Sequence, residues 1–432
     1  MNTMTQTNEN KVSPFGEVLG NRNFRLLWIG EGVSVLGDHF YMIALPWLVL
    51  QLTGDSLAMG TVLALSAIPR ALLMLVGGAL TDRFSPRSLM LASNAVRFIL
   101  VSILTGLVFA NRVEMWMLYT LAVLFGVADA FFYPAQSSMT PQLVKKDQLQ
   151  VANSLIQGTM MLTMLAGPAL AGLLIAALGD GHSESADMQG IAAAFGLDAL
   201  TFLASLITLI FIKTPQNESS EASENILESI RSGMKFVWND VPLRAFFFVV
   251  AAITFFFNGP FNIGIPLLAD TRFPEGAVAY GTILSTWGAG SLIGMALAGV
   301  LPRPNPKMMG IVLLSLVSGM GIGLTLLGLS TSMIFAALVS LTLGTLDGYI
   351  NIFFVTWVQS RAPKAFIGRL MSLLMFSSIG LLPVSMSLSG AISRVDVSLL
   401  LIISGGIVAL LGFLMTLNPT VRAMEPSAQI GD

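Results

Sequence analysis

The stretch Gly78–Arg87 reads Gly-Ala-Leu-Thr-Asp-Arg-Phe-Ser-Pro-Arg, and long apolar runs lie on both sides of it. It carries one acidic and two basic side chains, those of Asp82, Arg83 and Arg87. An apolar run of about 20 residues is long enough to cross a bilayer core as a helix. We therefore interpret Gly78–Arg87 as a polar turn that joins two membrane helices on one side of a membrane.

The composition of the whole chain indicates the same class of protein. The chain has 432 residues, of which 54% are hydrophobic and 11% are charged, and its mean hydropathy is +0.79. Soluble domains carry about 25% charged residues, so we expect a polytopic membrane protein. Cysteine is absent and the histidines are His39 and His182, which argues against a disulfide framework and against a thiolate or histidine metal centre. No phosphate-binding loop of the Gly-x-x-x-x-Gly-Lys kind occurs, so we expect no ATPase and no cofactor.

Apolar runs of sufficient length predict an all-α protein with twelve membrane helices. They lie at about 25–52, 57–80, 88–110, 115–138, 150–178, 191–212, 243–268, 278–301, 307–328, 333–357, 367–392 and 396–417. When the amino terminus is placed inside, most of the 22 lysines and arginines fall in cytoplasmic segments, which is the distribution that membrane proteins favour. We therefore expect both termini to be cytoplasmic, and the first residues to form a tail rather than a signal peptide.

The longest polar break divides the chain into two halves. The predicted organisation is a tail at 1–24, a six-helix bundle at 25–212, a linker with an amphipathic helix at 213–242, a second six-helix bundle at 243–417 and a tail at 418–432. The halves are weakly repeated, since Gly126 and Asp129 match Gly344 and Asp347 at one common offset. Two related bundles with binding between them are a recurring transporter design.

Charged side chains within the predicted spans are costly, and they mark functional sites by default. They are Glu31, Asp38, Arg70, Arg97, Asp129, Asp198 and Asp347. Glu31 and Asp38 are seven residues apart and share one helix face, so we interpret them as carboxyls that couple transport to protons or substrate. Arg70, Arg97 and Asp198 are interpreted as charge partners, with a purely structural ion pair as the alternative. Asp129 and Asp347 fit either role.

Glycine, proline and asparagine mark two irregular positions. The Gly167-Pro168 step of the fifth span predicts a bent helix that acts as a pivot, because proline removes a helix hydrogen bond and glycine allows close helix approach. The seventh span is interrupted at Asn258-Gly259-Pro260. Broken backbone beside polar side chains is typical of a cavity wall. We expect the cavity lining to include Tyr133, Asn258, Asn262 and Asn351.

The Gly78–Arg87 turn resembles the signature between the second and third helices of the major facilitator superfamily, usually Gly-x-Leu-x-Asp-Arg-x-Gly-Arg-Arg/Lys. The chain keeps Gly78, Asp82, Arg83 and Arg87 but has Ser85-Pro86 in place of Gly-Arg. The resemblance implies that these four kept residues form a cytoplasmic gate. The Gly167-Pro168 helix is similar to the antiporter signature of that family in reduced form.

Further stretches narrow the resemblance. Asn21–Trp28, Gly37-Asp38, Ala44–Trp47, Pro69-Arg70 and Leu197–Ala199 look like the drug-efflux branch that includes macrolide efflux proteins and the enterobactin exporter. This likeness implies a monomeric carrier of the bacterial inner membrane that exports amphipathic small molecules by proton antiport and alternating access. The alternatives are a metabolite importer or facilitator, and a lipid flippase-like protein. An enzyme is disfavoured because no set of nucleophile, base and orienting group is evident.

Overall fold

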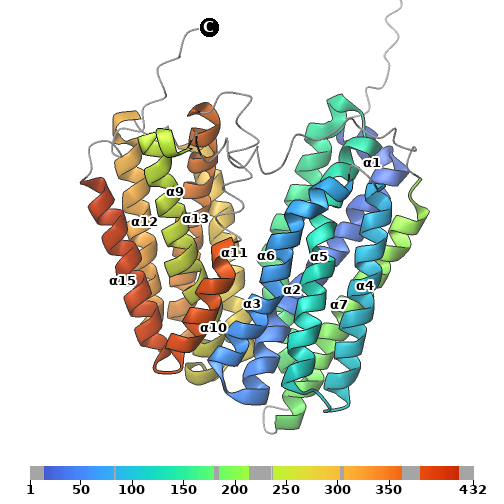
Figure 1. Ribbon diagram of the computed structural model, residues 1–432, viewed down its shortest axis with the longest axis horizontal. Helices are drawn as coiled ribbons and strands as arrows, with labels where there is room; N and C mark the ends of the chain where they lie inside the picture. Colours follow the sequence, from blue (N-terminus) through green and yellow to red (C-terminus); the bar gives the residue numbers. More distant parts are fainter. Residues whose placement is uncertain are drawn as a thin grey trace, which may run out of the picture.

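The computed structural model describes residues 14–81, 84–179, 184–213, 235, 237–301, 306–361 and 380–417, and the regular elements of these residues are helices (Figure 1). The amino-terminal helices are α1 (Pro14–Gly20), α2 (Arg22–Thr53), α3 (Ser56–Thr81), α4 (Pro86–Phe109), α5 (Met115–Leu143), the short 3-10 turn η1 (Lys146–Gln148), α6 (Leu149–Leu178) and α7 (Glu184–Phe211). The carboxy-terminal ones are α9 (Val241–Ile253), the π-helical turn η2 (Thr254–Asn258), α10 (Gly259–Arg272), α11 (Ala277–Val300), α12 (Pro306–Gly328), α13 (Met333–Arg361), the helix Gly380–Ser393 and α15 (Val397–Thr416).

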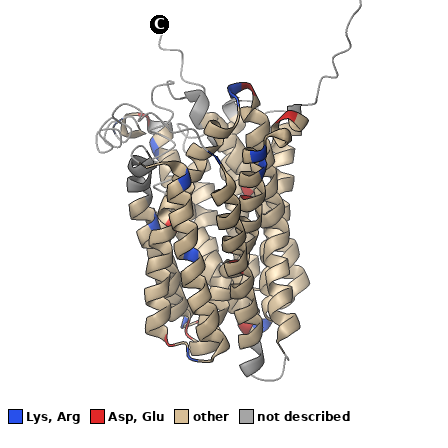
Figure 2. Ribbon diagram, turned by 90° about the vertical axis from the view of Figure 1, so that its right-hand side faces the viewer, with Lys and Arg blue, Asp and Glu red and all other residues tan. Residues whose placement is uncertain are grey.

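These helices make the chain a multi-pass membrane protein. Within the described residues, 11 helical segments are long and apolar enough to cross a membrane, and Gly380–Ser393 is a shorter apolar helix. This set is consistent with the twelve predicted spans, although the first part of the eleventh span, 367–379, lies outside the described residues. Figure 2 shows charged positions mainly at the two ends of the bundle, with few between them.

Local sequence explains where the helices begin and end. The Asn21 side chain accepts hydrogen bonds from the backbone N–H groups of Asn23 and Phe24 at 3.0 and 3.2 Å, which caps the start of α2. Ser85 accepts from the N–H of Ser88 at 3.2 Å, and Pro86 is the first residue of α4. Serine at a helix cap followed by proline is a strong start signal. Ser85-Pro86, which stands in place of Gly-Arg in the major facilitator signature, therefore marks the start of α4.

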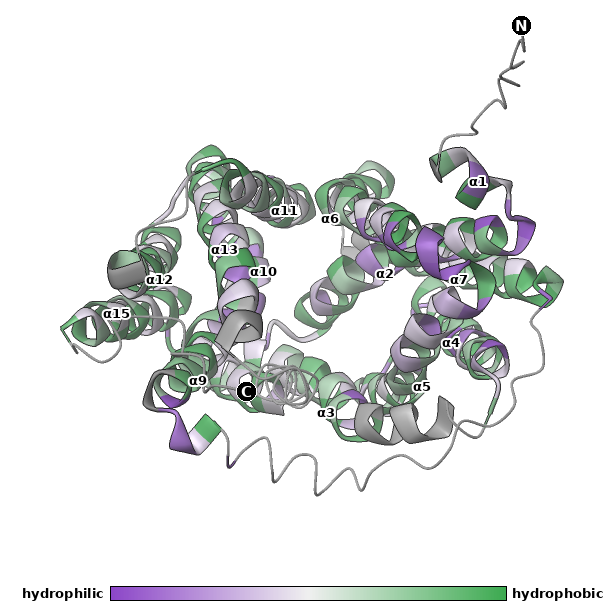
Figure 3. Ribbon diagram, turned by 90° about the horizontal axis from the view of Figure 1, so that it is seen from above, coloured by the Kyte–Doolittle hydropathy of each residue, from purple (hydrophilic) through white to green (hydrophobic). Residues whose placement is uncertain are grey.

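Two groups of helices lie side by side, α2 to α7 on one side and α9 to α15 on the other (Figures 1 and 3). The matched glycines Gly126 and Gly344 have equivalent places in the two groups. A Cβ atom on Gly126 of α5 would lie 2.1 Å from the Ser66 carbonyl oxygen of α3, and one on Gly344 of α13 would lie 2.0 Å from that of Trp287 in α11. Each glycine thus lets its helix pack backbone to backbone against an equivalent neighbour.

The two groups meet along α6 and α11 and at one end of the bundle. A Cβ atom on Gly281 of α11 would lie 2.2 Å from the Pro168 carbonyl oxygen of α6, so the two helices touch at the backbone. The N–H of Ala169 donates to Ser285 Oγ at 2.9 Å across the same contact. At the end where α2 finishes, Ser56 Oγ donates to the Gly390 carbonyl at 3.0 Å. We call this the closed end, because the ribbons of the two groups lean apart toward the opposite end, which carries α1 (Figure 1).

The predicted interruption of the seventh span is confirmed. The backbone passes from α9 into α10 through η2, a π-helical turn. In a π turn the carbonyl of Phe255 would accept from the N–H five residues on, which is Pro260 and has no N–H. Ser385 from the helix Gly380–Ser393 donates its hydroxyl to that carbonyl instead. The irregular backbone is therefore satisfied by a neighbouring helix.

Candidate functional site

A network of charged side chains lies near the middle of the amino-terminal group, with Arg97 of α4 at its centre. Arg97 Nη1 is 3.1 Å from Asp129 Oδ1 of α5 and 3.9 Å from Asp38 Oδ1 of α2. The Arg97 side chain is 1% exposed, whereas that of Asp38 is 42% exposed. The predicted pairing of Arg97 with these carboxyls is therefore present in the structure, and Asp38 is the accessible member of the pair.

Uncharged side chains also contact Arg97 and hold its guanidinium in place. Its Nη2 donates to Asn94 Oδ1 at 2.9 Å, and Asn94 Nδ2 donates to Ser205 Oγ of α7 at 2.9 Å. The guanidinium carbon lies 4.1 Å from the ring centre of Phe132 and 4.8 Å from that of Phe202. Cation–π contacts with both rings attract the guanidinium and limit its movement. Arg97 is thus a fixed cation.

Arg70 is the second cation of the network, and it differs from Arg97 in exposure. Its Nη1 lies 3.4 Å from Asp129 Oδ2, and its side chain is 45% exposed. Asp129 consequently lies between two arginines, one fixed and one accessible. The predicted role of Arg70 as a charge partner applies to Asp129.

Asp198 of α7 supplies a third carboxyl beside Asp38. It is fully buried, and Thr201 Oγ1 donates to its Oδ1 at 3.5 Å. A Cβ atom on Gly37, the neighbour of Asp38, would lie 2.6 Å from Asp198 Oδ1. Asp198 Oδ2 has no hydrogen-bond partner. Together with Asp38 and Asp129, it brings three carboxyls to two guanidinium groups, so the network is neutral only when one carboxyl holds a proton.

Glu31 lies apart from this network, which corrects the expectation that an arginine is its partner. The structure has no ion pair to Glu31 from the described arginines. Instead, Gln136 Nε2 of α5 donates to Glu31 Oε2 at 2.8 Å, while Glu31 Oε1 is buried without a partner. Seven-residue spacing placed Glu31 and Asp38 on one face of α2, but it could not show that Gln136 rather than an arginine lies opposite Glu31.

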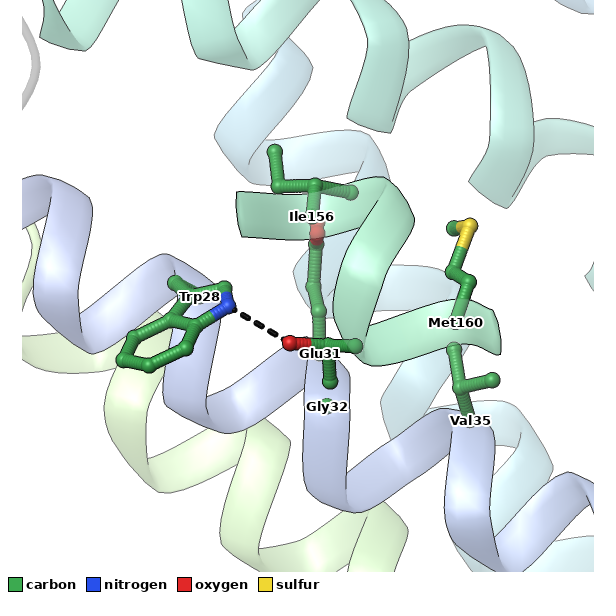
Figure 4. Close-up of a pocket in the computed structure, with 7 residues that line it drawn as sticks. Trp28, Glu31, Gly32, Val35, Ile156 and Met160 are labelled. Atoms are coloured by element: carbon green, nitrogen blue, oxygen red, sulfur yellow. Dashed lines mark hydrogen bonds between the residues drawn. The ribbon is translucent and has the colours of Figure 1, made fainter. Parts of the chain in front are cut away.

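A small cavity borders Glu31, between α2 and α6 (Figure 4). Its volume is about 10 Å³, which is space for roughly one water molecule. Trp28, Gly32 and Val35 line it from α2, and Ile156, Thr159 and Met160 from α6. The dashed line in Figure 4 marks the hydrogen bond from Trp28 Nε1 to Thr159 Oγ1, which is 2.8 Å long.

The residues predicted to line a cavity are spread over both groups of helices. Tyr133 is 52% exposed, and Asn262 and Asn351 are also exposed. Asn258 is half-buried, and its carbonyl accepts from Asn262 Nδ2 at 2.7 Å. Asp347 is half-buried on α13, with no ion pair to another described residue. Among the described residues, no hydrogen bond or ion pair joins these side chains to the Arg97 network.

The predicted gate is described only in part. Gly78 lies within α3, while Asp82 and Arg83 lie outside the described residues. Arg87 donates from Nε to the Leu209 carbonyl at 2.9 Å and from Nη2 to the Ile210 carbonyl at 2.7 Å. A basic side chain on the last carbonyls of a helix stabilises its carboxyl end, so Arg87 ties the start of α4 to the end of α7.

The predicted pivot packs against both groups of helices. A Cβ atom on Gly167 would lie 2.7 Å from the ring of His39 on α2. The carbonyl of Pro168, as described above, contacts Gly281 of α11 in the other group. Gly167-Pro168 therefore has neighbours in both groups, and its role as a pivot stays a prediction.

Sequence reasoning missed the ion pair at the closed end. Arg394, just after the helix Gly380–Ser393, donates from Nε to Asp55 Oδ1 at 2.7 Å, and its Nη2 pairs with Asp55 Oδ2. Gln51 Nε2 also donates to Asp270 Oδ1 at 3.0 Å, from α2 to α10. The signal available for it was Arg394 itself, a basic residue between the predicted spans 367–392 and 396–417, on the side of the membrane opposite to most lysines and arginines when the amino terminus is placed inside.

Comparison with known proteins identifies the family of the chain. The model of the Major Facilitator Superfamily matches residues 27–382. The chain belongs to the major facilitator superfamily, a family of transporters. It is 22% identical to macrolide efflux protein A of Streptococcus pyogenes over 411 residues, covering 93% of this chain and 97% of that protein. It is 25% identical to the multidrug efflux pump Tap of Mycolicibacterium fortuitum over 364 residues, covering 83% of this chain and 86% of that protein.

Solved structures of low sequence identity share the fold. A bacterial homologue of the iron transporter ferroportin, solved in an inward-facing state, has a TM-score of 0.70 at 15% identity and covers 91% of this chain and 98% of its own. The nucleoside transporter NupG has a TM-score of 0.67 at 12% identity and covers 93% of this chain and 98% of its own. The predicted all-α major facilitator fold is thereby confirmed.

Proposed function

We propose that this transporter exports amphipathic small molecules from the cytoplasm in exchange for protons. The observation that carries the proposal is the charge balance around Arg97. Three carboxyls, those of Asp38, Asp129 and Asp198, face two guanidinium groups within the membrane-spanning region. Unbalanced charge at this depth is costly, so the network favours binding one further positive charge, either a proton or a cationic group of the substrate.

Asp38 and Asp129 are the coupling carboxyls in this proposal. Both contact Arg97 Nη1, and Asp38 is the more exposed of the two. When Asp38 takes a proton, Arg97 keeps only Asp129, and when Asp38 loses the proton it regains its attraction to Arg97. A carboxyl that changes partners with its protonation state is able to alternate between proton and substrate. Asp347 supplies a further carboxyl on the other group of helices for substrate contact.

Alternating access is the motion that this coupling would drive. The contacts at the closed end hold the two groups together there, and the groups lean apart toward α1 (Figure 1). In our proposal the α1 end faces the cytoplasm, so the structure corresponds to a carrier open toward the cytoplasm. Gly78, Asp82, Arg83 and Arg87 would close that end in the opposite state, and Gly167-Pro168 would be the pivot.

Export is the direction favoured by the relatives, which are efflux proteins over nearly the full length of the chain. We place the protein in a bacterial inner membrane as a monomer, with both termini in the cytoplasm. The division into bundles at 25–212 and 243–417, with a linker at 213–242, is part of the same proposal, since most of the linker lies outside the described residues.

Transport by purified protein in proteoliposomes tests the proposal. A pH gradient of either sign is imposed, and the movement of erythromycin, ethidium and a catecholate siderophore is followed, with empty liposomes as the control. We expect at least one probe to move against its own gradient toward the acidic side. Movement with protons toward the alkaline side would indicate an importer, and transfer of a labelled phospholipid without a gradient would indicate a lipid-handling protein.

A further inference from the structure

A line of buried polar atoms without partners runs along α2 from Asp38 toward Glu31. Ser34 lies between them, one turn from each, and is 2% exposed. Both Ser34 Oγ and Glu31 Oε1 lack a hydrogen-bond partner among the residues that the structure describes. Unpaired buried polar atoms are rare and call for an explanation, such as an unseen water or a functional proton. Here two of them fall on one helix face beside the Arg97 network.

The direction of this line is toward the α1 end. Asn21, at the start of α2, donates to the Leu143 carbonyl at the end of α5 at 2.5 Å, so both helices reach that end together. Glu31 is nearer than Asp38 to the start of α2, and Gln136 is nearer than Asp129 to the end of α5. A seven-residue step along a helix is about 10 Å. Glu31 and Gln136 thus form a second level, about two turns nearer to the α1 end than the charged network.

The groups around Glu31 allow it to hold a proton on one defined oxygen. Gln136 occupies Oε2 with a donor N–H, which leaves Oε1 as the oxygen able to carry the proton. From the helices packed there, α5 presents Gln136, α6 presents Thr159 with Ile156 and Met160, and α7 presents Ser205 and Thr208 beside Gly30, none of which is charged. No cation balances a carboxylate at this position among the described residues. A neutral carboxyl could donate its proton to a water in the adjacent cavity of about 10 Å³ (Figure 4).

We propose that Glu31, Ser34 and the adjacent one-water cavity form a proton-transfer site, separate from the Arg97 network, that passes protons between Asp38 and the α1 end. Ser34 Oγ has no direct hydrogen bond to either carboxyl, so the proton leaves Asp38 for water hydrogen-bonded to the Ser34 hydroxyl, which both accepts and donates, and from that water it reaches Glu31 Oε1. Glu31 then releases a proton to the cavity water and accepts the next one from the water at Ser34. The direction of proton flow rests on the proposed function, whereas the presence of a proton on Glu31 does not.

Infrared spectroscopy of the purified protein tests the proton directly, without any substrate. The wild-type protein should show the C=O stretch of a protonated carboxyl that Glu31→Gln removes and Asp38→Asn leaves. The band should weaken reversibly as the pH is raised, because a transfer site exchanges its proton with bulk water. A spectrum unchanged by Glu31→Gln would mean that Glu31 holds no proton, and would overturn the proposal.

Transport tests the path, with erythromycin and ethidium as probes in proteoliposomes. Ser34→Ala and Glu31→Gln should lower proton-driven movement by about a hundredfold or more, which is the usual size of the effect of a lost proton-transfer group. Both should keep gradient-free exchange of the probe, and Ser34→Thr should restore the driven rate because it keeps the hydroxyl.

Ser93→Ala is the matched control. Ser93 is a buried serine whose hydroxyl already donates to the Ala128 carbonyl at 2.7 Å. Removing this hydroxyl should leave both proton-driven movement and gradient-free exchange unchanged. Equal losses of driven transport and exchange in Glu31→Gln would assign Glu31 to substrate binding and overturn the transfer role. Absence of proton-driven movement in the wild-type protein, with the Glu31 band present, would reject the proposed function and the direction of flow but keep the proton on Glu31.

Discussion

Asp38 and Asp129, on two different helices, share one terminal nitrogen of Arg97. Nη1 lies 3.1 Å from the Asp129 carboxyl and 3.9 Å from that of Asp38. Because Asn94, Phe132 and Phe202 hold the guanidinium in place, the carboxyls must adapt to Arg97 and not the reverse. A change of protonation at either carboxyl therefore alters how the other one is held.

The first prediction concerns Asp38→Asn. This change removes the accessible carboxyl but leaves the Arg97–Asp129 contact, so the protein should reach the membrane at normal levels. Proton-driven export should fall by about a hundredfold or more, since loss of a proton-transfer group typically costs that much. Transport in proteoliposomes under a pH gradient measures it. Full activity of the variant would remove Asp38 from the mechanism.

The second prediction concerns Asn94, which is fully buried between Arg97 and Ser205. Asn94→Leu leaves part of the guanidinium without its acceptor, which costs about 1–3 kcal/mol for a buried group, and it frees Arg97 to move. The thermal midpoint and the proton-driven rate should both fall. Ser205→Ala breaks only the outer hydrogen bond and should have a smaller effect on both. Equal effects of Asn94→Leu and Ser93→Ala would argue against a positioning role for Asn94.

The sequence predicted the features that can be read from each helix separately. Membrane depth alone marked Arg97 as a charge partner and Asp129 as a carboxyl that fits either a coupling or a structural role, and the matched Gly126 and Gly344 indicated that the two halves are related. In contrast, the partner of Glu31 depends on which helix faces it, and spacing along α2 says nothing about α5. Glu31 was therefore expected beside an arginine, although Gln136 lies there.

The closed-end ion pair could not be predicted for a related reason. Asp55 and Arg394 are 339 residues apart and lie in short turns. The sequence shows which residues lie in turns, but it does not show which two turns meet. Only the packing of two helix groups brings these turns together.

The third prediction uses the repeated glycines. Gly126→Ala and Gly344→Ala each place a methyl group within about 2 Å of a backbone carbonyl oxygen, and that oxygen cannot move without its helix. Overpacking of this kind costs about 1–3 kcal/mol. Thermal unfolding of the detergent-solubilised protein should show a lower midpoint for both variants. Gly158→Ala is the control, because a Cβ atom there meets nothing within 4 Å; an equal loss in the control would refute the explanation.

The fourth prediction concerns the Asp55–Arg394 pair as a latch between the two groups. Asp55→Asn should increase the population in which the closed end separates, and the double variant Asp55→Arg with Arg394→Asp should restore the wild-type distribution. The increase should be no more than about fivefold, since exposed ion pairs contribute little. The chain has no cysteine, so spin labels on cysteines introduced at Leu52 and Val395, which are 37% and 80% exposed, report the distance without background. An unchanged distance distribution in Asp55→Asn would show that the pair does not hold the closed end.

The fifth prediction gives the pH dependence of that latch. The hydrogen bond from Arg394 lowers the pKa of Asp55 below its usual value of 3.8, and the backbone N–H of Leu57 acts in the same direction. A carboxyl with a lowered pKa stabilises the paired state fully above the usual value, and this contribution is lost as the pH falls through the lowered pKa. The distance between labels at Leu52 and Val395 should therefore stay constant from neutral pH down to about 4 and lengthen only in stronger acid. In Asp55→Asn that acid transition should be absent, because no carboxyl remains to titrate; a transition near neutral pH in the wild-type protein would assign control of the closed end to another group.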